Sequence, residues 1–423
     1  MVFRREKIWL QGLLIMLVVS LSFGLLQRLT SPVASQPQPL FDAVWETVND
    51  NFYDPDFNGV DWSALGEQYR PQVAASEEKA TLINQMLSQL NTSHTHLYTP
   101  DEPAYYQLLG IFYPRISEFK TRLADRFPEG KLEYTGLGIV THEKAGNTFI
   151  KAIFDGGSAD KAGLKVGDQI LSVAGEPFHP IRSFLGQAGR PVQMQVRPNG
   201  NSQKAVTVTP RLYDGITMFL EAMDNSIEVI QKAGKQIGYV HIWSYAGDQY
   251  QEKLENELFY GRLKDADALV LDLRDGWGGA PLTALNVYTA RGPSLTNIGR
   301  DRTPVTYRSQ WNKPVVMLVN GGSRSAKEIL AYGFQQYDIG PVVGTTTAGA
   351  VTAGRAFIMP DDSLLYVAVA DVYVDETIRL EGVGVTPDVT VPFPVEYAQG
   401  ADPQKERAIA TALDRLNNPS AKQ

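Results

Sequence analysis

Residues 314–330 read PVVMLVNGGSRSAKEIL. The apolar run predicts a buried strand, and the glycine-rich turn after it leads directly into a helical pattern. A helix N-terminus presents backbone N–H donors and the positive end of the helix dipole. A serine at this junction therefore lies where the oxyanion of an acyl-transfer reaction could be stabilised. Ser323 and Ser325 both occupy the junction.

A second strand end predicts a partner for this junction. Residues 268–273 form an apolar run that continues into Arg274-Asp275-Gly276-Trp277-Gly278-Gly279, and the glycines allow backbone N–H groups to approach a substrate carbonyl closely. Similar β-like runs occur at 237–242 and 341–345, with helical patterns between several of the runs. Residues 213–400 are therefore predicted to form a βα-layered domain with its site at the strand ends.

Two regions with different sequence patterns precede this domain. Residues 40–130 show helical spacing, with Phe41, Val44 and Val48 on one apolar face, and predict a helical N-terminal subdomain. Residues 131–212 contain short apolar strands separated by glycine-rich turns, which predicts a compact, mostly β module. The remaining residues, 401–423, are predicted to form a C-terminal amphipathic helix and tail. The expected fold class is α+β with several domains.

Composition excludes several classes of function. The 423 residues contain no cysteine, which excludes disulfides, thiolate metal sites and cysteine nucleophiles. A net charge of −8 offers no broad basic face for nucleic acid. The five histidines are scattered and form no metal-ligand pattern, so no metal site is predicted.

The N-terminus predicts export. Three basic residues precede an apolar stretch at 8–26, which has the charge and length of a signal segment or a single membrane anchor. We predict an anchor or signal within residues 1–30, a Pro/Gln-rich linker at 31–39, and a catalytic part outside the cytoplasm, in a periplasm or lumen. A buried core helix is the alternative interpretation of 8–26.

The β module resembles a PDZ domain. The resemblance rests on YTGLGI at 134–139 and on GSADKAGL at 157–164 followed by VGDQIL at 166–171. It implies that Gly136, Leu137, Gly138 and Ile139 receive the C-terminus of a protein or peptide, which would add a strand to an exposed sheet edge. The alternative is that these glycines only permit turns.

Together with EGVGVTPD at 381–388, the two strand-end turns resemble the tail-specific, or C-terminal processing, serine protease superfamily, which includes the tricorn core protease. The resemblance covers nearly all the chain after Leu40 and implies a ClpP/crotonase-like catalytic domain without a cofactor. It also implies that Ser325 is the nucleophile and that the N–H groups of Ala326 and of Gly278 or Gly279 form the oxyanion hole. Ser323 is then the second candidate nucleophile.

The general base departs from the common family pattern. Many processing proteases place a lysine where this chain has Ala350, and we interpret Lys327 as a solvated charge on another helix face. Residues 91–96, NTSHTH, resemble the segment by which tricorn-like members supply a histidine. This resemblance implies that His94 is the base, with Glu381 as the acid that orients it and Ser93 as a helper.

Three functions follow, in order of preference. The first is an exported serine endopeptidase that cleaves C-terminal regions of proteins or peptides through an acyl-enzyme. The second is a non-catalytic PDZ protein that binds peptides or acts as a scaffold at the membrane surface. The third is a carrier of apolar ligands, by analogy with the retinoid-binding interphotoreceptor protein, another member of the superfamily that the chain resembles. Hydrolysis that depends on Ser325 distinguishes the first from the other two.

Overall fold

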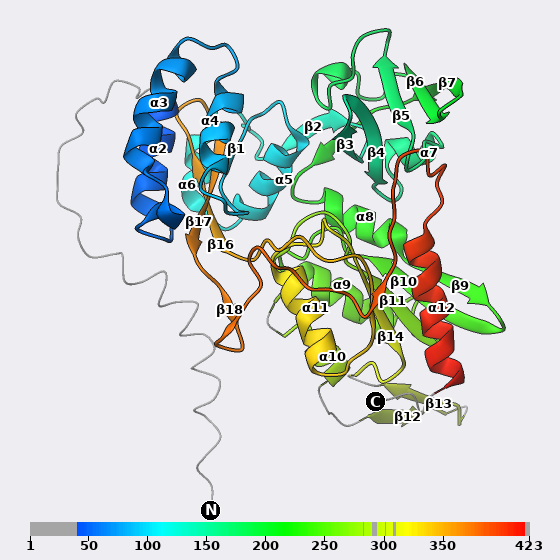
Figure 1. The fold of residues 1–423 in the computed structure, drawn as a ribbon. Helices are drawn as coiled ribbons and strands as arrows, with labels where there is room; N and C mark the ends of the chain where they lie inside the picture. Colours follow the sequence, from blue (N-terminus) through cyan, green and yellow to red (C-terminus); the bar gives the residue numbers. More distant parts are fainter. Residues whose placement is uncertain (1–39, 282, 290–293, 301, 308–309, 419–423) are drawn as a thin grey trace, which may run out of the picture. The chain divides into compact units, whose positions relative to one another are not determined.

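The computed structural model describes residues 40–281, 283–289, 294–300, 302–307 and 310–418 (Figure 1). The predicted membrane segment at 8–26 and the linker at 31–39 lie outside these residues. None of the helices in the described ranges is long and apolar enough to cross a bilayer.

The N-terminal part is helical, as the apolar spacing predicts. Phe41, Val44 and Val48 are buried on one face of α2. Asp61 is the N-cap of α3, and its side chain accepts a hydrogen bond from Ala64 N at 2.9 Å. The helices here are α2 (Leu40–Asn51), the 3-10 helix η1 (Phe57–Gly59), α3 (Trp62–Ala74), α4 (Lys79–Ser88), α5 (Pro103–Phe112) and α6 (Ser117–Arg122).

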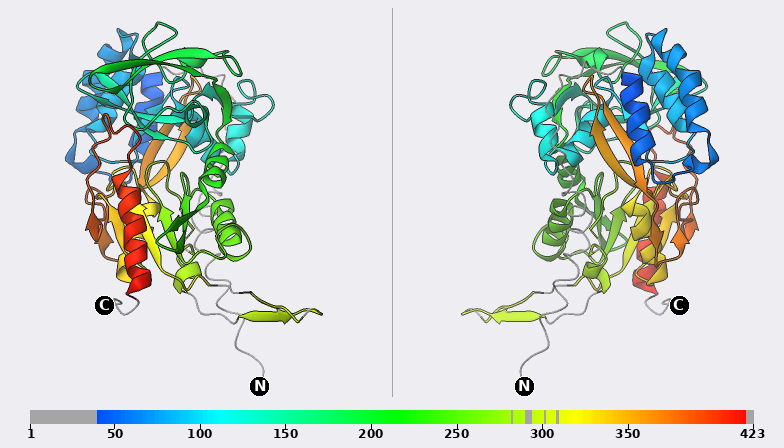
Figure 2. Two further views of the ribbon diagram at one scale, coloured as in Figure 1. Left: turned by 90° about the vertical axis from the view of Figure 1, so that its right-hand side faces the viewer. Right: turned by 90° about the vertical axis from the view of Figure 1, so that its left-hand side faces the viewer.

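A hairpin from late in the chain completes the core of these helices. Strands β16 (Ala353–Ile358) and β17 (Leu364–Ala370) pair with β1 (His96–Tyr98) in the order β1-β17-β16. In β17, Leu365 and Val367 are fully buried in one cluster with the apolar faces of α2 and α4. Figure 2 shows this orange hairpin against the blue helices. Strands almost 270 residues apart in the sequence therefore pair next to Thr92-Ser93-His94, which we call the TSH segment.

The β module folds as a five-stranded sheet in the order β3-β4-β5-β6-β7, which leaves β3 at an edge. The predicted strands and the predicted short helix are present, and a separate buried core includes Leu137, Ile150, Leu164 and Met194. The elements are β2 (Glu133–Gly136), β3 (Ile139–Lys144), β4 (Asn147–Ile153), α7 (Ser158–Lys161), β5 (Gln169–Val173), η2 (Arg182–Phe184), β6 (Val192–Asn199), β7 (Ser202–Val208) and β8 (Arg211–Asp214), with β2 paired to β8.

A six-stranded sheet in the order β20-β15-β14-β11-β10-β9 forms the centre of the third part. Its strands are parallel except β9, which forms an antiparallel hairpin with β10. The elements of this part are α8 (Met218–Ser226), β9 (Glu228–Lys232), β10 (Lys235–His241), α9 (Asp248–Phe259), β11 (Ala268–Asp272), α10 (Asn286–Thr289), β12 (Leu295–Ile298), β13 (Pro304–Tyr307), β14 (Val315–Val319), α11 (Ala326–Gln336), β15 (Val342–Gly344), β18 (Tyr373–Val374), β19 (Ile378–Arg379), β20 (Val389–Thr390) and α12 (Pro403–Asn417).

Both faces of this sheet are covered, which explains why its strands are continuous apolar runs. Alternate residues of β14 point to opposite faces. Met317 belongs to the cluster that contains Phe334 of α11, whereas Val316 and Leu318 pack in the cluster with Ile409 of α12. Figure 1 shows α11 and α12 on opposite sides of the strands. The carboxyl ends of β10, β11 and β14 therefore meet at one edge, as expected for the site.

Candidate active site

Ser325 lies at a sharp turn between β14 and α11. Its backbone has φ 57° and ψ −133°, a conformation that a non-glycine residue adopts only under strain. Similar strained strand-to-helix turns expose nucleophilic serines in hydrolases. The N–H of Ser325 donates to Ala350 O at 2.7 Å, and Glu328 Oε1 accepts from the same N–H at 3.2 Å. Ala326 begins the helix, where N–H groups have no intrahelical partner.

The glycine turn after β11 lies directly against this serine. A Cβ atom added to Gly278 would lie 2.5 Å from Ser325 Cβ and 2.7 Å from Arg324 O. Gly279 has φ 96°, which favours glycine. The N–H of Trp277 donates to Trp243 O at 2.8 Å, which ties the turn to the end of β10. The backbone groups predicted to hold an oxyanion thus belong to two adjoining turns.

Ser93 connects His94 to Glu381. Ser93 Oγ lies 2.7 Å from His94 Nδ1 and donates to Glu381 Oε2 at 3.0 Å. Since the hydroxyl proton is used toward the carboxylate, Nδ1–H of His94 donates to Ser93 Oγ, and Nε2 is left as the acceptor. Glu381 Oε1 also accepts the backbone N–H of Ser93 at 3.0 Å. The carboxylate therefore orients the imidazole through Ser93, whose part is larger than that of the helper expected from the sequence.

The strap at residues 347–352 joins this relay to Ser325. Val351 N and Thr352 N donate to Glu381 Oε2 at 2.6 and 3.0 Å, while Ala350 O accepts from Ser325. Ala350 is buried and contributes only its backbone to the site. One continuous strap thus positions both ends of the site.

Glu328 anchors the strap from below. This fully buried carboxylate accepts from Thr347 Oγ1 at 2.5 Å and from the N–H groups of Gly349 and Ala350 at 2.7 Å each. Its spacing from Ser325, three residues along a helix, places it at the first turn.

The electrostatics of the site keep the His94 imidazole neutral at neutral pH. Burial, together with the nearby Arg324 guanidinium, lowers the pKa of His94 to about 4, although Glu381 acts in the opposite direction. Burial acts to raise the pKa of Glu381, but hydrogen bonds from Val351, Ser93 and Thr352 outweigh it and lower that pKa. At neutral pH the pair is a neutral imidazole and a carboxylate.

The interpretation of Lys327 as a solvated charge is wrong. Its side chain is fully buried, and Nζ donates to Asp275 O at 2.8 Å and to Trp243 O at 3.1 Å. Burial lowers the pKa of Lys327 to about 7, against the opposing charges of Asp272 and Asp275. The first turn of α11 packs onto the ends of β10 and β11. Lys327 therefore binds the carbonyl groups of Trp243, just after β10, and of Asp275, in the glycine turn.

Ser323 has the structural role that its position in the turn suggests. Its side chain is fully buried, and Oγ donates to Leu273 O at 2.9 Å and accepts from Asn320 N at 3.0 Å. Both functions of the hydroxyl are therefore used within the turn. Ser325 therefore remains the predicted nucleophile of the junction.

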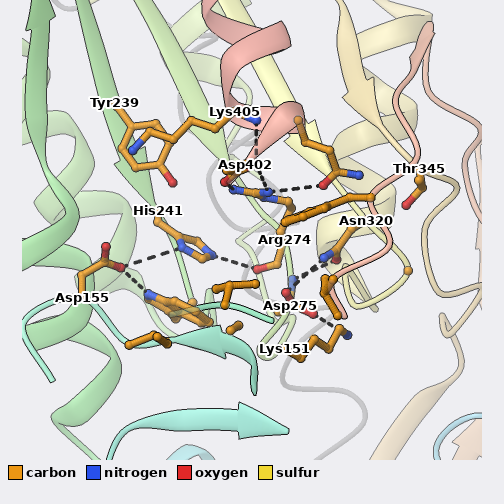
Figure 3. A pocket seen from close by; sticks show the side chains of 18 residues that line it. Lys151, Asp155, Tyr239, His241, Arg274, Asp275, Asn320, Thr345, Asp402 and Lys405 are labelled. Carbon is orange, nitrogen blue, oxygen red and sulfur yellow. Dashed lines mark hydrogen bonds and ion pairs between the residues drawn. The ribbon is translucent and has the colours of Figure 1, made fainter. Parts of the chain in front are cut away.

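A cavity of about 430 Å³ lies at the same strand ends, between the β module and the sheet. In Figure 3, Asp275 lies between Lys151 and Asn320. Lys151 of β4 forms an ion pair with Asp275 Oδ1 at 2.7 Å, and Asn320 Nδ2 donates to Asp275 Oδ2 at 3.0 Å. The β module thus contacts Asp275 of the glycine turn.

The residues predicted to bind a C-terminus lie at the start of the edge strand β3. Gly136 ends β2, and Ile139 begins β3. Between them, Leu137 O accepts from Ala159 N at 2.9 Å. Gly138 has φ 73°, and a Cβ there would lie 2.5 Å from Tyr213 Oη, so glycine is required at this position.

Comparison with known proteins supports these assignments at the level of family. The family models described as Tricorn protease C1 domain, PDZ domain and Peptidase family S41 match residues 35–88, 126–195 and 236–391. Residues 236–391 are therefore similar to the peptidases of family S41. The predicted PDZ module is thereby confirmed, and the predicted family is correct.

Two relatives illustrate the range of proteins to which the chain is similar. The carboxyl-terminal-processing protease of Synechocystis is 26% identical over 89% of this chain and 86% of its own length. Tricorn protease homolog 1 of Streptomyces coelicolor is 27% identical over 96% of this chain, which spans only 37% of that protein. Among solved structures, mature CPAF matches 90% of this chain and 99% of its own with 13% identity and a TM-score of 0.51, which shows a common fold.

Proposed function

We propose that the chain is a serine endopeptidase that cleaves C-terminal regions of proteins or peptides, with Ser325 as nucleophile and His94 as general base. The observation that carries the proposal is the hydrogen-bond path from Glu381 through Ser93 to His94 Nδ1. It leaves Nε2 free to accept a proton. The names of the S41 relatives, which include carboxyl-terminal-processing protease, favour the same substrate class.

In the proposed reaction His94 transfers the proton and backbone N–H groups stabilise the oxyanion. His94 Nε2 takes the proton of Ser325 Oγ as the oxygen attacks the scissile carbonyl, and Nδ1–H stays bonded to Ser93. The N–H groups of Ala326 and of Gly278 or Gly279 stabilise the oxyanion. His94 then returns the proton to the leaving amine, and water hydrolyses the acyl-enzyme by the same steps.

The β module would present the substrate. We propose that a protein C-terminus binds at residues 136–139 and extends along the open edge of β3. Since Lys151 of the same module contacts Asp275, the module that holds the substrate also touches the glycine turn.

The test is covalent labelling with a fluorophosphonate, followed by mass spectrometry of the proteolytic fragments. A phosphonyl adduct is expected on Ser325, because the probe reacts only with an activated serine. The rate should fall on acidification with a midpoint near pH 4, since His94, whose pKa is lowered to about 4, is protonated below that pH and cannot accept a proton. An adduct on another serine, or no adduct on folded protein that hydrolyses no peptide, would refute the proposal.

We also propose that the catalytic part is exported, on the basis of the basic residues and apolar run at 8–26. Expression of the full chain in bacteria should leave residues 40–418 accessible to an added protease after the outer membrane is opened. Protection of these residues until the inner membrane is lysed would contradict export.

A further inference from the structure

Arg324 is a cation beside the nucleophile that the proposed reaction does not use. Its guanidinium carbon lies 5.3 Å from the centre of the Trp277 ring, and its positive charge acts on the hydroxyl of Tyr98. Its charge acts on both His94 and His96. The group therefore lies between the glycine turn, the TSH segment and the serine.

Aromatic rings lie beside Arg324, while the carboxylates of Glu381 and Glu102 act electrostatically on its neighbours His94 and Tyr98. Besides Trp277 and Tyr98, the ring of Tyr366 lies within reach of its charge, and burial keeps the pKa of both histidines near 4. Among the ion pairs of the described residues, none includes Arg324. Its side chain is only partly exposed. A partly desolvated guanidinium with no anionic partner gains strongly when a carboxylate arrives, and its planar donors can hold both carboxylate oxygens.

We propose that Arg324 forms a subsite for a carboxylate of the substrate next to the scissile bond. The carboxylate could come from an acidic side chain or from the substrate's own C-terminus, since both offer the same pair of oxygens. The inference rests on the proposed function, because it places a peptide at Ser325, and it specifies the substrate as one with an anionic group close to the cleaved bond.

A bound carboxylate would also strengthen the base. The charged groups that act on His94 are Arg324 and, through Ser93, Glu381. A carboxylate paired with Arg324 cancels the charge that lowers the pKa of His94, so the imidazole becomes a better proton acceptor. An anionic substrate would therefore bind at Arg324 and also raise the pKa of His94.

The experiment measures peptide binding to the Ser325→Ala variant by calorimetry, so that turnover cannot interfere. Four peptides of one sequence carry either Glu or Gln near the cleavage site and either a free or an amidated C-terminus. Loss of the relevant carboxylate should weaken binding roughly tenfold to a hundredfold, the range of a charge-assisted hydrogen bond. The carboxylate whose loss has this effect identifies the source.

Variants of Arg324 separate this subsite from the β module. In Ser325→Ala/Arg324→Gln the preference should disappear, and in Ser325→Ala/Arg324→Lys it should persist in weaker form. Lys232→Gln removes an equal charge from exposed strand β9 and should leave the preference unchanged. Thermal melts of each variant establish that it is folded.

Each outcome is decisive. Equal affinities for all four peptides would overturn the proposed subsite. A preference that persists in Arg324→Gln would also overturn it, because the carboxylate would then bind elsewhere, for example at residues 136–139. Wild-type hydrolysis is measured separately. Cleavage without a carboxylate preference refutes only the subsite, whereas a preference without cleavage refutes only the proposed function.

Discussion

Replacing Ser325 by alanine should lower kcat/KM by about 10⁴-fold or more, His94→Ala should do nearly the same, and the double variant should be no worse than either. The reason is that the two side chains act as one unit. Without the imidazole the hydroxyl keeps its proton, and without the hydroxyl the imidazole has none to accept. The measurement is peptide hydrolysis by the wild type and the three variants at pH 7.

Ser323→Ala is the matched control for this series. The variant removes the other serine of the junction, whose hydroxyl bonds Leu273 O and Asn320 N. It should melt at a lower temperature, because buried backbone groups lose their partner, while the folded fraction keeps its activity. Multiplicative losses in the Ser325/His94 double variant, or an inactive but folded Ser323→Ala, would contradict the assignment.

Ser93→Ala and Glu381→Gln extend the series along the relay. Ser93→Ala removes the group that accepts from His94 Nδ1, so the imidazole loses its orientation and its preferred tautomer, at a cost of roughly 10²-fold to 10⁴-fold in kcat. Glu381→Gln can still accept from Ser93 and should cost less. A larger effect at Glu381 than at Ser93 would mean that the carboxylate acts on His94 directly.

Local patterns in the sequence were sufficient to predict the helical face of α2, the apolar strands of the central sheet and the turn that carries Ser325. They were sufficient because each depends on neighbours within a few residues. Lys327 was misjudged for the same reason. Its helix spacing excludes it from the face of Ser325, but only the packing of α11 on β10 and β11 determines that the other face is buried.

The relay needed information that no local pattern holds. Ser93 and Glu381 are separated by 288 positions, and the antiparallel pairing of β1 with β17 helps to bring the TSH segment to the catalytic part. The hairpin that supplies β17 was expected within the catalytic domain, and its apolar residues gave no sign that they would pack on α2 and α4. Long-range pairing of this kind depends on the whole fold.

Gly278→Ala should lower kcat by roughly 10²-fold to 10³-fold, the cost of losing one oxyanion donor, while the protein remains folded. The added methyl would lie 2.5 Å from Ser325 Cβ and 2.7 Å from Arg324 O, so either the glycine turn or the serine turn must move. Gly278 does not have a positive φ, so alanine adds no backbone strain there. The measurement is steady-state hydrolysis together with the fluorophosphonate labelling rate.

Gly321→Ala is the control for this substitution. It lies in the turn before Ser325, it has no positive φ, and its nearest neighbour to a new Cβ is Thr346 O at 3.9 Å. The same chemical change should therefore leave kcat nearly unaltered. If both alanines were equally harmless, the close approach of the two turns would not be needed for catalysis, and the oxyanion donors would have to be sought elsewhere than in the glycine turn. If Gly278→Ala lowers kcat but leaves KM unchanged, the contact stabilises the transition state more than the bound substrate. The reason is that displaced N–H donors weaken binding to the oxyanion more than binding to the substrate carbonyl.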